Sequence, residues 1–279
     1  MQELPGVFLQ FKVNRSKKPI IFRDRFGFQF WQYPGDDVRY HRRHNAITDS
    51  IGVVNFILKH VKPGSTCVDI GAAKAAVSVS MWSKTGLSGR VISVEADVSK
   101  IARIKANLKL NGFPQDFVAS VAISDGVGIR SLRCYPDSPG WNTLGNPEFA
   151  KDYESFVIDV QTIDFSRLLQ SYEIEYVDLV KLDTEGAELL ILQGMRRYLA
   201  EQRIGCVVFE VNPLTLPGLG TTVQQLFSFW DNLEYRLYQL SDDGSLTPLL
   251  NNSWPSGGVG ACVALAGRGA IGDSLDKPH

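Results

Sequence analysis

The sequence contains little cysteine and no long apolar run. Its four cysteines are Cys67, Cys134, Cys206 and Cys262, and no two of them have a C-x-x-C spacing. This pattern indicates neither a zinc ribbon nor a disulfide framework, so we expect free thiols in a reducing, cytoplasmic compartment. No stretch reaches the roughly 18 apolar residues of a membrane helix, and the first 30 residues lack the apolar core of a signal peptide. We therefore expect a soluble protein without a membrane partner.

An excess of charge of either sign is also missing. The 29 basic and 30 acidic side chains give a net charge of -1, so the composition does not indicate a nucleic-acid partner. His41 and His44 have an H-x-x-H spacing, but they lie among arginines without a complete ligand set, and no metal site is predicted there. Apolar residues are plentiful: 44% of the 279 residues are hydrophobic, which is enough for the core of one large domain.

The chain is predicted to have two parts, a small β-rich cap over residues 1–47 and a main domain over residues 48–279. Two short strand-like runs in the cap, 20–23 and 26–33, are followed by a turn-forming Pro-Gly-Asp-Asp sequence. In the main domain, strands are expected at 66–70, 90–95, 116–121, 176–182, 204–211, 235–240 and 259–266, and helices near 51–61, 75–85, 98–111, 164–172, 186–200 and 221–232. This alternation predicts a mostly parallel seven-stranded sheet covered on both faces, with the last two strands pairing antiparallel at an edge.

The most informative stretch is the apolar strand at 176–182, which ends in charged residues and leads directly into a helix. Because side chains alternate along a strand, Lys181 and Asp183 lie on the same face and are neighbours of opposite charge. Ligands bind at such carboxyl ends of strands in open α/β sheets, which makes Asp183, Glu185 and Lys181 candidate site residues. On position alone, another interpretation remains: Asp183 caps the helix, Glu185 stabilises its positive end and Lys181 is a satisfied ion-pair partner.

A second candidate region begins at Cys67, where a buried strand ends in small residues just before a helix. A nucleotide-like ligand approaches backbone amides at such a place, and Glu95 at the end of the next strand is suited to accept hydrogen bonds from ribose hydroxyls. A nicotinamide-dependent dehydrogenase has a similar acid, but its loop reads G-x-G-x-x-G, and here Ala73 and Ala76 occupy the second and third glycine positions. Asp69 within the strand favours S-adenosylmethionine, whose amino group and sulfonium attract carboxylates.

Several further motifs follow in order along the chain. They are Val68-Asp69-Ile70-Gly71-Ala72, Val94-Glu95, Ala106-Asn107 with Asn111-Gly112, the runs 121–125, 140–144, 162–164 and 177–188, and Phe209-Glu210-Val211-Asn212. In this respect the sequence resembles the FkbM family of S-adenosylmethionine-dependent methyltransferases, from about Asp49 to Asn212. The resemblance implies a Rossmann-like class I methyltransferase fold and O-methylation of a hydroxyl on a small metabolite, sugar or natural product.

The resemblance also implies roles for individual residues. The cofactor-binding candidates are Asp69, Gly71, Ala72, Ala73, Glu95, Ala96, Val121, Ala122 and Asp183. Asp183 is the first candidate for general base or substrate orienter, Glu185 is the second, and Lys181 is the charge that tunes both. Trp141 and Asn142 lie in a Pro/Gly-rich loop, 136–147, which we interpret as a lid over the substrate.

A magnesium ion is an alternative partner for the acidic residues. Asp183, Glu185 and Glu210 could gather around such an ion, but Lys181 beside Asp183 lessens the need for a cation, and no metal is expected.

The cofactor loop departs from the family pattern. The family continues its first motif as Gly-Ala-Asn-x-Gly, and here Ala73 and Ala75 replace the Asn and the second Gly. An added Cβ at a residue with positive φ costs roughly 1–2 kcal/mol, which would weaken cofactor binding about 5- to 30-fold without abolishing it. The departure leaves a second hypothesis open, a non-catalytic relative that binds a ligand through the same fold. The sequence does not indicate an oligomeric state.

Overall fold

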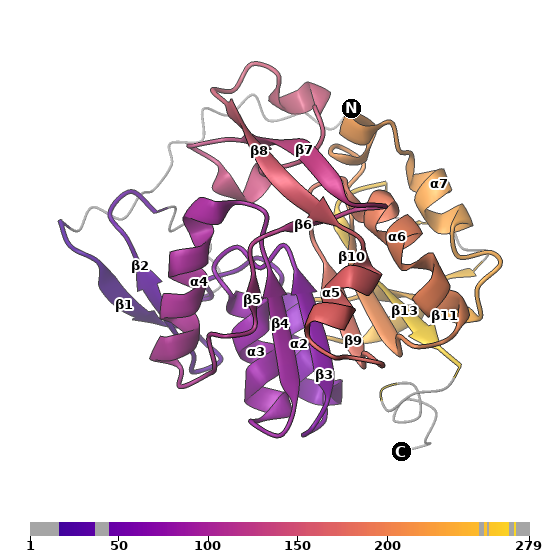
Figure 1. Ribbon diagram of the computed structural model, residues 1–279, viewed down its shortest axis with the longest axis horizontal. Helices are drawn as coiled ribbons and strands as arrows, with labels where there is room; N and C mark the ends of the chain where they lie inside the picture. The colour runs from indigo at the N-terminus through magenta and orange to yellow at the C-terminus, as the bar shows by residue number, and fades with distance from the viewer. Residues whose placement is uncertain (1–16, 37–44, 251–253, 256, 268–270, 272–279) are drawn as a thin grey trace. The chain divides into compact units, whose positions relative to one another are not determined.

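A computed structural model describes residues 17–36, 45–250, 254–255, 257–267 and 271 (Figure 1). The chain divides into two compact units, one ending at Asp49 and one beginning at Ser50. In the first unit, β1 (Ile20–Arg23) and β2 (Gln29–Gln32) pair antiparallel, and the Asp24 carboxylate accepts hydrogen bonds from the backbone of the connecting turn. The two strands expected here are thus confirmed, although the second is shorter than predicted. His41 and His44 lie outside the described residues.

The second unit is built on a mixed sheet that has eight strands in the described part of the chain. In spatial order these are β12 (Leu246–Pro248), β11 (Tyr235–Leu240), β13 (Gly260–Ala266), β10 (Cys206–Val211), β9 (Leu179–Leu182), β3 (Thr66–Ile70), β4 (Arg90–Val94) and β5 (Val118–Ala119). The strands from β5 to β10 run parallel, and β13 runs antiparallel between β10 and β11. The predicted count of seven strands is wrong because the three-residue β12 lies in a turn-rich segment. The predicted antiparallel pairing of the last two long strands is confirmed, but neither of them is the edge strand, because β12 lies outside β11.

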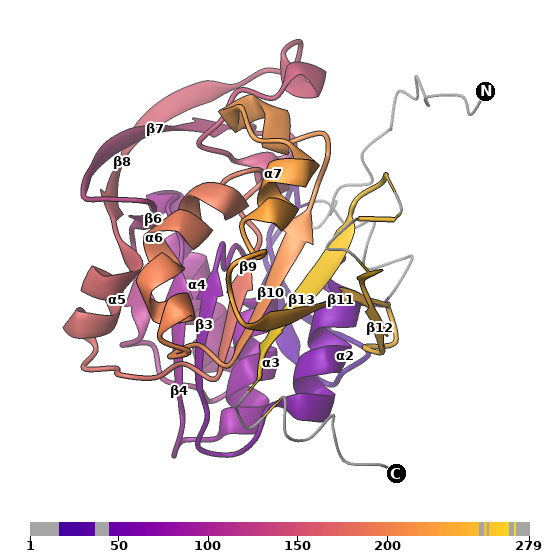
Figure 2. The same cartoon turned by 90° about the vertical axis from the view of Figure 1, so that its right-hand side faces the viewer.

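Helices cover both faces of this sheet, as the alternating pattern predicted. They are α2 (Ile51–His60), α3 (Ala76–Thr85), α4 (Val98–Leu110), α5 (Phe165–Ser171), α6 (Glu188–Ala200) and α7 (Val223–Ser228). Helices α2 and α3 lie on one face, and α5 and α6 on the other (Figure 2). Apolar side chains of α5, α6 and α7 pack against Val68, Val180 and Val207 of the sheet and form the main core. Within the described residues, no helix combines the length and the apolar character that a membrane crossing requires.

A second, three-stranded sheet was not predicted. It consists of β6 (Ala122–Ile123), β8 (Phe156–Ile163) and β7 (Gly128–Cys134), with β8 in the middle. Strand β7 reads Gly-Ile-Arg-Ser-Leu-Arg-Cys, and only Leu132 and Cys134 of this strand are buried. Because so few of its residues are apolar, β7 lacks the alternating pattern that predicts a strand. The connection from β7 to β8 contains two short 3-10 helices, Pro139–Trp141 and Glu148–Ala150.

The central strands end at the same level, which brings the motif residues together. Ile70 pairs with Leu182 across β3 and β9, and Leu182 pairs with Phe209 across β9 and β10. Beyond the strand ends, the Asp183 N–H donates to the Ile70 carbonyl at 3.2 Å. At Gly71, φ is +81° and a Cβ would lie 2.0 Å from the Asp183 carbonyl oxygen, so only glycine fits.

Candidate active site

A cavity opens at the carboxyl ends of β3, β4 and β9. Its volume is about 610 Å³, a figure that includes the open solvent at its mouth. The lining residues are Ile70, Gly71, Ala73, Val94, Glu95, Ala96, Lys100, Val121, Ala122, Ile123, Leu132, Gly140, Asn142, Leu144, Asp183, Thr184, Glu185, Ala187 and Ile191. Most of the predicted cofactor-binding residues are therefore in one cavity. Asp69, Ala72, Lys181 and Trp141 are not among the described residues that line it.

Lys181 lies beneath the cavity and joins two carboxylates. Its Nζ is 3.4 Å from Asp69 Oδ1 and 3.4 Å from Asp183 Oδ2, and it donates to the Gly71 carbonyl at 3.0 Å. Burial alone lowers the pKa of Lys181, but the charges of Asp183 and Asp69 outweigh burial, so its pKa is raised and the ammonium is retained. The expected proximity of Lys181 and Asp183 is confirmed.

Asp69 is enclosed below the cavity and is fully buried. Its Oδ2 accepts a hydrogen bond from Ser78 Oγ at 2.5 Å, and Ser93 Oγ donates in turn to Ser78 Oγ at 2.8 Å. Its Oδ1 has no hydrogen-bond partner among the described residues and is within ion-pair distance of Lys181 alone. Asp69 is therefore linked to the cavity through Lys181, which also pairs with Asp183.

Glu95 lies at the other end of the cavity and is held by two backbone amides. Its Oε2 accepts from the Ala73 N–H at 2.9 Å and its Oε1 accepts from the Asp97 N–H at 2.9 Å. Each carboxylate oxygen has a second lone pair that can accept another hydrogen bond. The carboxylate is thus fixed in position and still able to accept hydroxyl hydrogens from a ligand.

Glu185 has an unusual backbone conformation that its neighbours hold in place. Its φ is +53°, and the next residue, Gly186, has a φ of +105°. The buried Glu188 carboxylate accepts hydrogen bonds from the Thr184 and Gly186 amides at 2.8 and 3.0 Å, which fixes this turn. The sequence alone does not predict this role of Glu188, because its contacts with the Thr184 and Gly186 amides depend on the positive φ of the turn.

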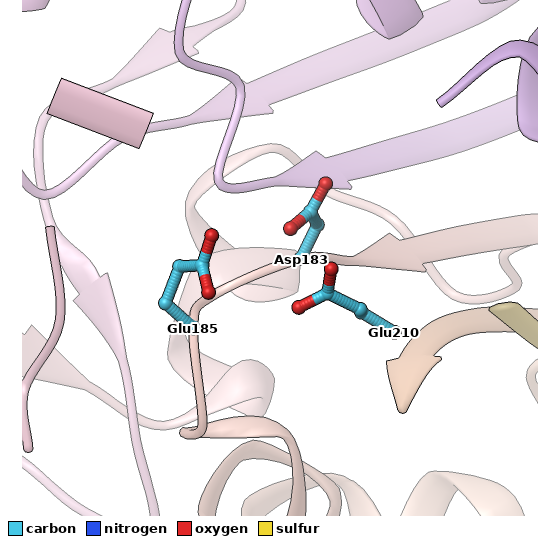
Figure 3. Close-up of side chains that lie close together, drawn as sticks. All are labelled: Asp183, Glu185 and Glu210. Atoms are coloured by element: carbon cyan, nitrogen blue, oxygen red, sulfur yellow. The ribbon is translucent and has the colours of Figure 1, made fainter. Parts of the chain in front are cut away.

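Three carboxylates meet at the ends of β9 and β10 (Figure 3). Ligand atoms of Asp183, Glu185 and Glu210 all lie within 4.8 Å of one another. The Asn212 side-chain amide lies 3.3 Å from Glu185 and 3.4 Å from Glu210. Burial, reinforced by the charges of Asp183 and Glu185, raises the pKa of Glu210 well above its usual value. The group can therefore hold a proton or accept a cationic ligand.

The loop at 136–147 forms one wall of the cavity through Gly140, Asn142 and Leu144. The neighbouring Trp141 ring packs instead among aromatic side chains, with ring centroids 5.2 Å from both Phe149 and Tyr153. Because its ring is engaged in this cluster, Trp141 anchors the loop, and the structure does not place it at the predicted substrate position.

The fold is that of the class I S-adenosylmethionine-dependent methyltransferases, with a parallel sheet, an antiparallel strand inserted near one edge, and a cavity at the strand ends. The chain belongs to the FkbM methyltransferase family: the model of the methyltransferase FkbM domain matches residues 69–238. S-adenosylmethionine is therefore the cofactor, and the nicotinamide-dependent dehydrogenase alternative is wrong. No curated protein matches this sequence.

Solved structures with a similar fold include three bacterial proteins. One from Streptococcus mutans, proposed to be a SAM-dependent methyltransferase, has 12% identity and a TM-score of 0.48, covering 90% of this chain and 57% of that one. A SAM-dependent O-methyltransferase from Thermotoga maritima has 15% identity and a TM-score of 0.44, covering 88% and 77%. An O-methyltransferase from Bacillus cereus in complex with SAH has 10% identity and a TM-score of 0.43, covering 78% and 82%. The chain thus spans little more than half the length of the Streptococcus mutans protein.

Proposed function

We propose that this protein transfers a methyl group from S-adenosylmethionine to a hydroxyl group of a small molecule. The observation that carries the proposal is one cavity lined by Glu95, which follows β4, and by Asp183 and Glu185, which follow β9, with β3 between these two strands. Such an arrangement supports a bound nucleoside at one end and an acceptor hydroxyl near a base at the other.

The residues of the cavity fit the cofactor. Glu95 can accept hydrogen bonds from the ribose hydroxyls, and Val121, Ala122 and Ile123 offer an apolar wall for the adenine. Asp183 supplies negative charge near the place of the amino group and the sulfonium. When bound, the cofactor supplies an electrophilic methyl group.

The protein's contribution to the reaction is alignment and proton removal. Holding two reactants in line lowers a barrier by about 7–11 kcal/mol, and the cavity walls restrict the acceptor in this way. Asp183 is our candidate general base, because it lines the cavity and its Oδ2 is fixed by Lys181 at 3.4 Å. A positioned base contributes about 10²- to 10⁴-fold. Glu185, whose carboxylate lies close to that of Asp183, orients the acceptor.

We further propose that the three carboxylates act without an obligatory metal ion. Lys181 offsets the charge of Asp183, and the raised pKa of Glu210 allows a proton to relieve the repulsion with Glu185. This arrangement keeps one carboxylate, Asp183, available as the base.

A second candidate function is ligand binding without catalysis. The observation that favours it is the positive φ of both Ala73 and Ala75, at +50° and +62°, in the loop that approaches the cofactor. This confirms the expected strain at the departure from the family pattern.

Transfer of a labelled methyl group separates these functions. The protein and S-adenosylmethionine with a labelled methyl group are incubated with fractionated hydroxylated metabolites, and products are identified by mass spectrometry, with Asp183→Asn as the inactive control. We expect a labelled methyl ether. A label on nitrogen or carbon would contradict O-methylation, and cofactor binding without any labelled product would favour the binding protein.

A further inference from the structure

Asn142 lies on the wall of the cavity with both ends of its amide engaged by protein groups. Its Nδ2 donates to Asp97 Oδ2 at 2.9 Å, and its Oδ1 accepts from the Tyr135 N–H at 3.1 Å. The side chain therefore connects the loop at 136–147 to the start of α4, which is 45 residues away in sequence. These two hydrogen bonds hold the loop in place, and they leave little of the amide free to contact a substrate.

Further hydrogen bonds connect Asp97 to the cofactor loop that contains Ala73. The Asp97 N–H donates to Glu95 Oε1, and Glu95 Oε2 accepts from the Ala73 N–H, both at 2.9 Å. A continuous path of hydrogen bonds thus runs from Ala73 through Glu95 and Asp97 to Asn142. The acid expected to bind the ribose is the central member of this path.

The rest of the loop is held on the same side of the cavity. Lys100 Nζ donates to the Pro139 carbonyl at 2.8 Å and lies 3.9 Å from Asp97 Oδ2. Thr143, next to Asn142, donates from its hydroxyl to the Glu185 carbonyl at 2.7 Å. The two neighbouring residues Asn142 and Thr143 therefore contact opposite ends of the cavity, the end of Glu95 and the end of Glu185.

We propose that Asn142 is a positioning residue that latches the loop onto Asp97 and so closes the cavity over a bound cofactor. This inference rests on the proposed function, because it assumes that the cofactor binds beside Glu95. A bound ligand would hold Glu95 in place, and the loop holds Asp97 in place through Asn142. Because Glu95 and Asp97 are joined by a hydrogen bond, each of these two interactions stabilises the other, which is a coupling between two sites. The main consequence is slower release of the cofactor or its product.

The rate of release of S-adenosylhomocysteine from the full-length protein tests the latch. Asn142→Ala should release this probe about tenfold faster than the wild type, as expected for a coupling of ordinary size. The melting temperature without ligand is measured alongside, because loss of the hydrogen bond to the buried Asp97 carboxylate also lowers the stability of the protein. Asp137→Asn, an exposed change in the same loop, is the matched control and should behave as the wild type.

Asn142→Asp separates a latch from a loss of packing. This variant places a second carboxyl against Asp97, with Glu95 and Lys100 as the neighbouring charged groups. Cys134 is also near, but burial raises its thiol pKa to about 11, so it does not titrate in the range used. As the pH falls from about 8 to about 5, the carboxyl pair takes up a shared proton and the release rate should return toward that of the wild type. For Asn142→Ala, the release rate divided by that of the wild type should stay constant over the same pH range.

Three results would contradict these proposals in different ways. A wild-type protein that does not bind S-adenosylhomocysteine overturns both the proposed function and the latch. Binding by the wild type with an unchanged release rate in Asn142→Ala overturns the latch alone. A pH-independent effect in Asn142→Asp identifies a packing role and also overturns the latch.

Discussion

Lys181 and Asp69 form a buried ion pair across the neighbouring strands β9 and β3. The Lys181 Nζ lies 3.4 Å from Asp69 Oδ1, and the two side chains are 5% and 0% exposed. Since the same ammonium also pairs with Asp183 at the edge of the cavity, the core and the candidate base share one cation. Lys181 therefore links the stability of the sheet to the charge of the active site.

Removal of this cation should destabilise the protein strongly. In Lys181→Met, Asp69 remains buried without a counter-ion, and we expect the free energy of unfolding in urea to fall by about 3–5 kcal/mol. The double variant Asp69→Asn/Lys181→Met should recover much of this loss, because the fully buried charge is gone and Asp183, whose side chain is 29% exposed, remains in contact with solvent. Lys151→Met removes an exposed lysine and serves as the control. A double variant as unstable as Lys181→Met would contradict the ion-pair explanation.

Glu95 should control cofactor affinity. Loss of a hydrogen bond to a charged group costs about 1.5–3 kcal/mol, so Glu95→Ala should weaken binding of S-adenosylmethionine roughly 10- to 150-fold in calorimetry. The wild type should bind between micromolar and sub-millimolar concentrations. Glu148→Gln, at an exposed position in the second 3-10 helix, is the control. Unchanged affinity in a well-folded Glu95→Ala protein would remove Glu95 from the cofactor site.

Asp183 should matter more for turnover than for binding. Once an acceptor is identified, Asp183→Asn should lower kcat far more than it weakens cofactor binding, because the neutral amide cannot accept the hydroxyl proton. EDTA should leave turnover nearly intact. Activity that is lost with EDTA and restored by magnesium would indicate that Asp183, Glu185 and Glu210 are primarily metal ligands.

Ala75 offers a gain of stability. Its φ of +62° disfavours any residue with a Cβ, so Ala75→Gly should raise the free energy of unfolding by about 1 kcal/mol. It should also tighten cofactor binding if the loop relaxes. Ala76→Gly, one residue further inside α3, should instead destabilise by up to about 1 kcal/mol. Equal effects of the two substitutions would show that backbone strain at Ala75 is unimportant.

Glu210 should make stability depend on pH. Its pKa is raised in the folded state, so its contribution to stability is greatest below the unfolded value of about 4.3 and is lost as the pH rises through the folded value. Glu210→Gln should therefore be more stable than the wild type at neutral pH, and the difference should vanish as the pH falls toward about 4. Parallel stability curves for the two proteins would contradict the raised pKa.

The sequence allowed the prediction of elements that are buried on both sides. Strands β3 and β4 can be predicted because their apolar runs are continuous and end in motif residues. The contact between Lys181 and Asp183 can be predicted from the alternation of side chains along a strand. The polar strand β7 and the short β12 lack such a signal. The hydrogen bond between Asn142 and Asp97 could not be predicted from the sequence either, because only tertiary folding brings these two residues together.

The place of β13 bears on the synthesis of the protein. This strand pairs with β10 on one side and β11 on the other, although both precede it in the chain. Until residues 260–266 leave the ribosome, β10 and β11 each present an open backbone edge, and such edges pair readily with other chains. Completion of the sheet must therefore wait for β13, and during that interval these two edges are the places where pairing with another chain is easiest.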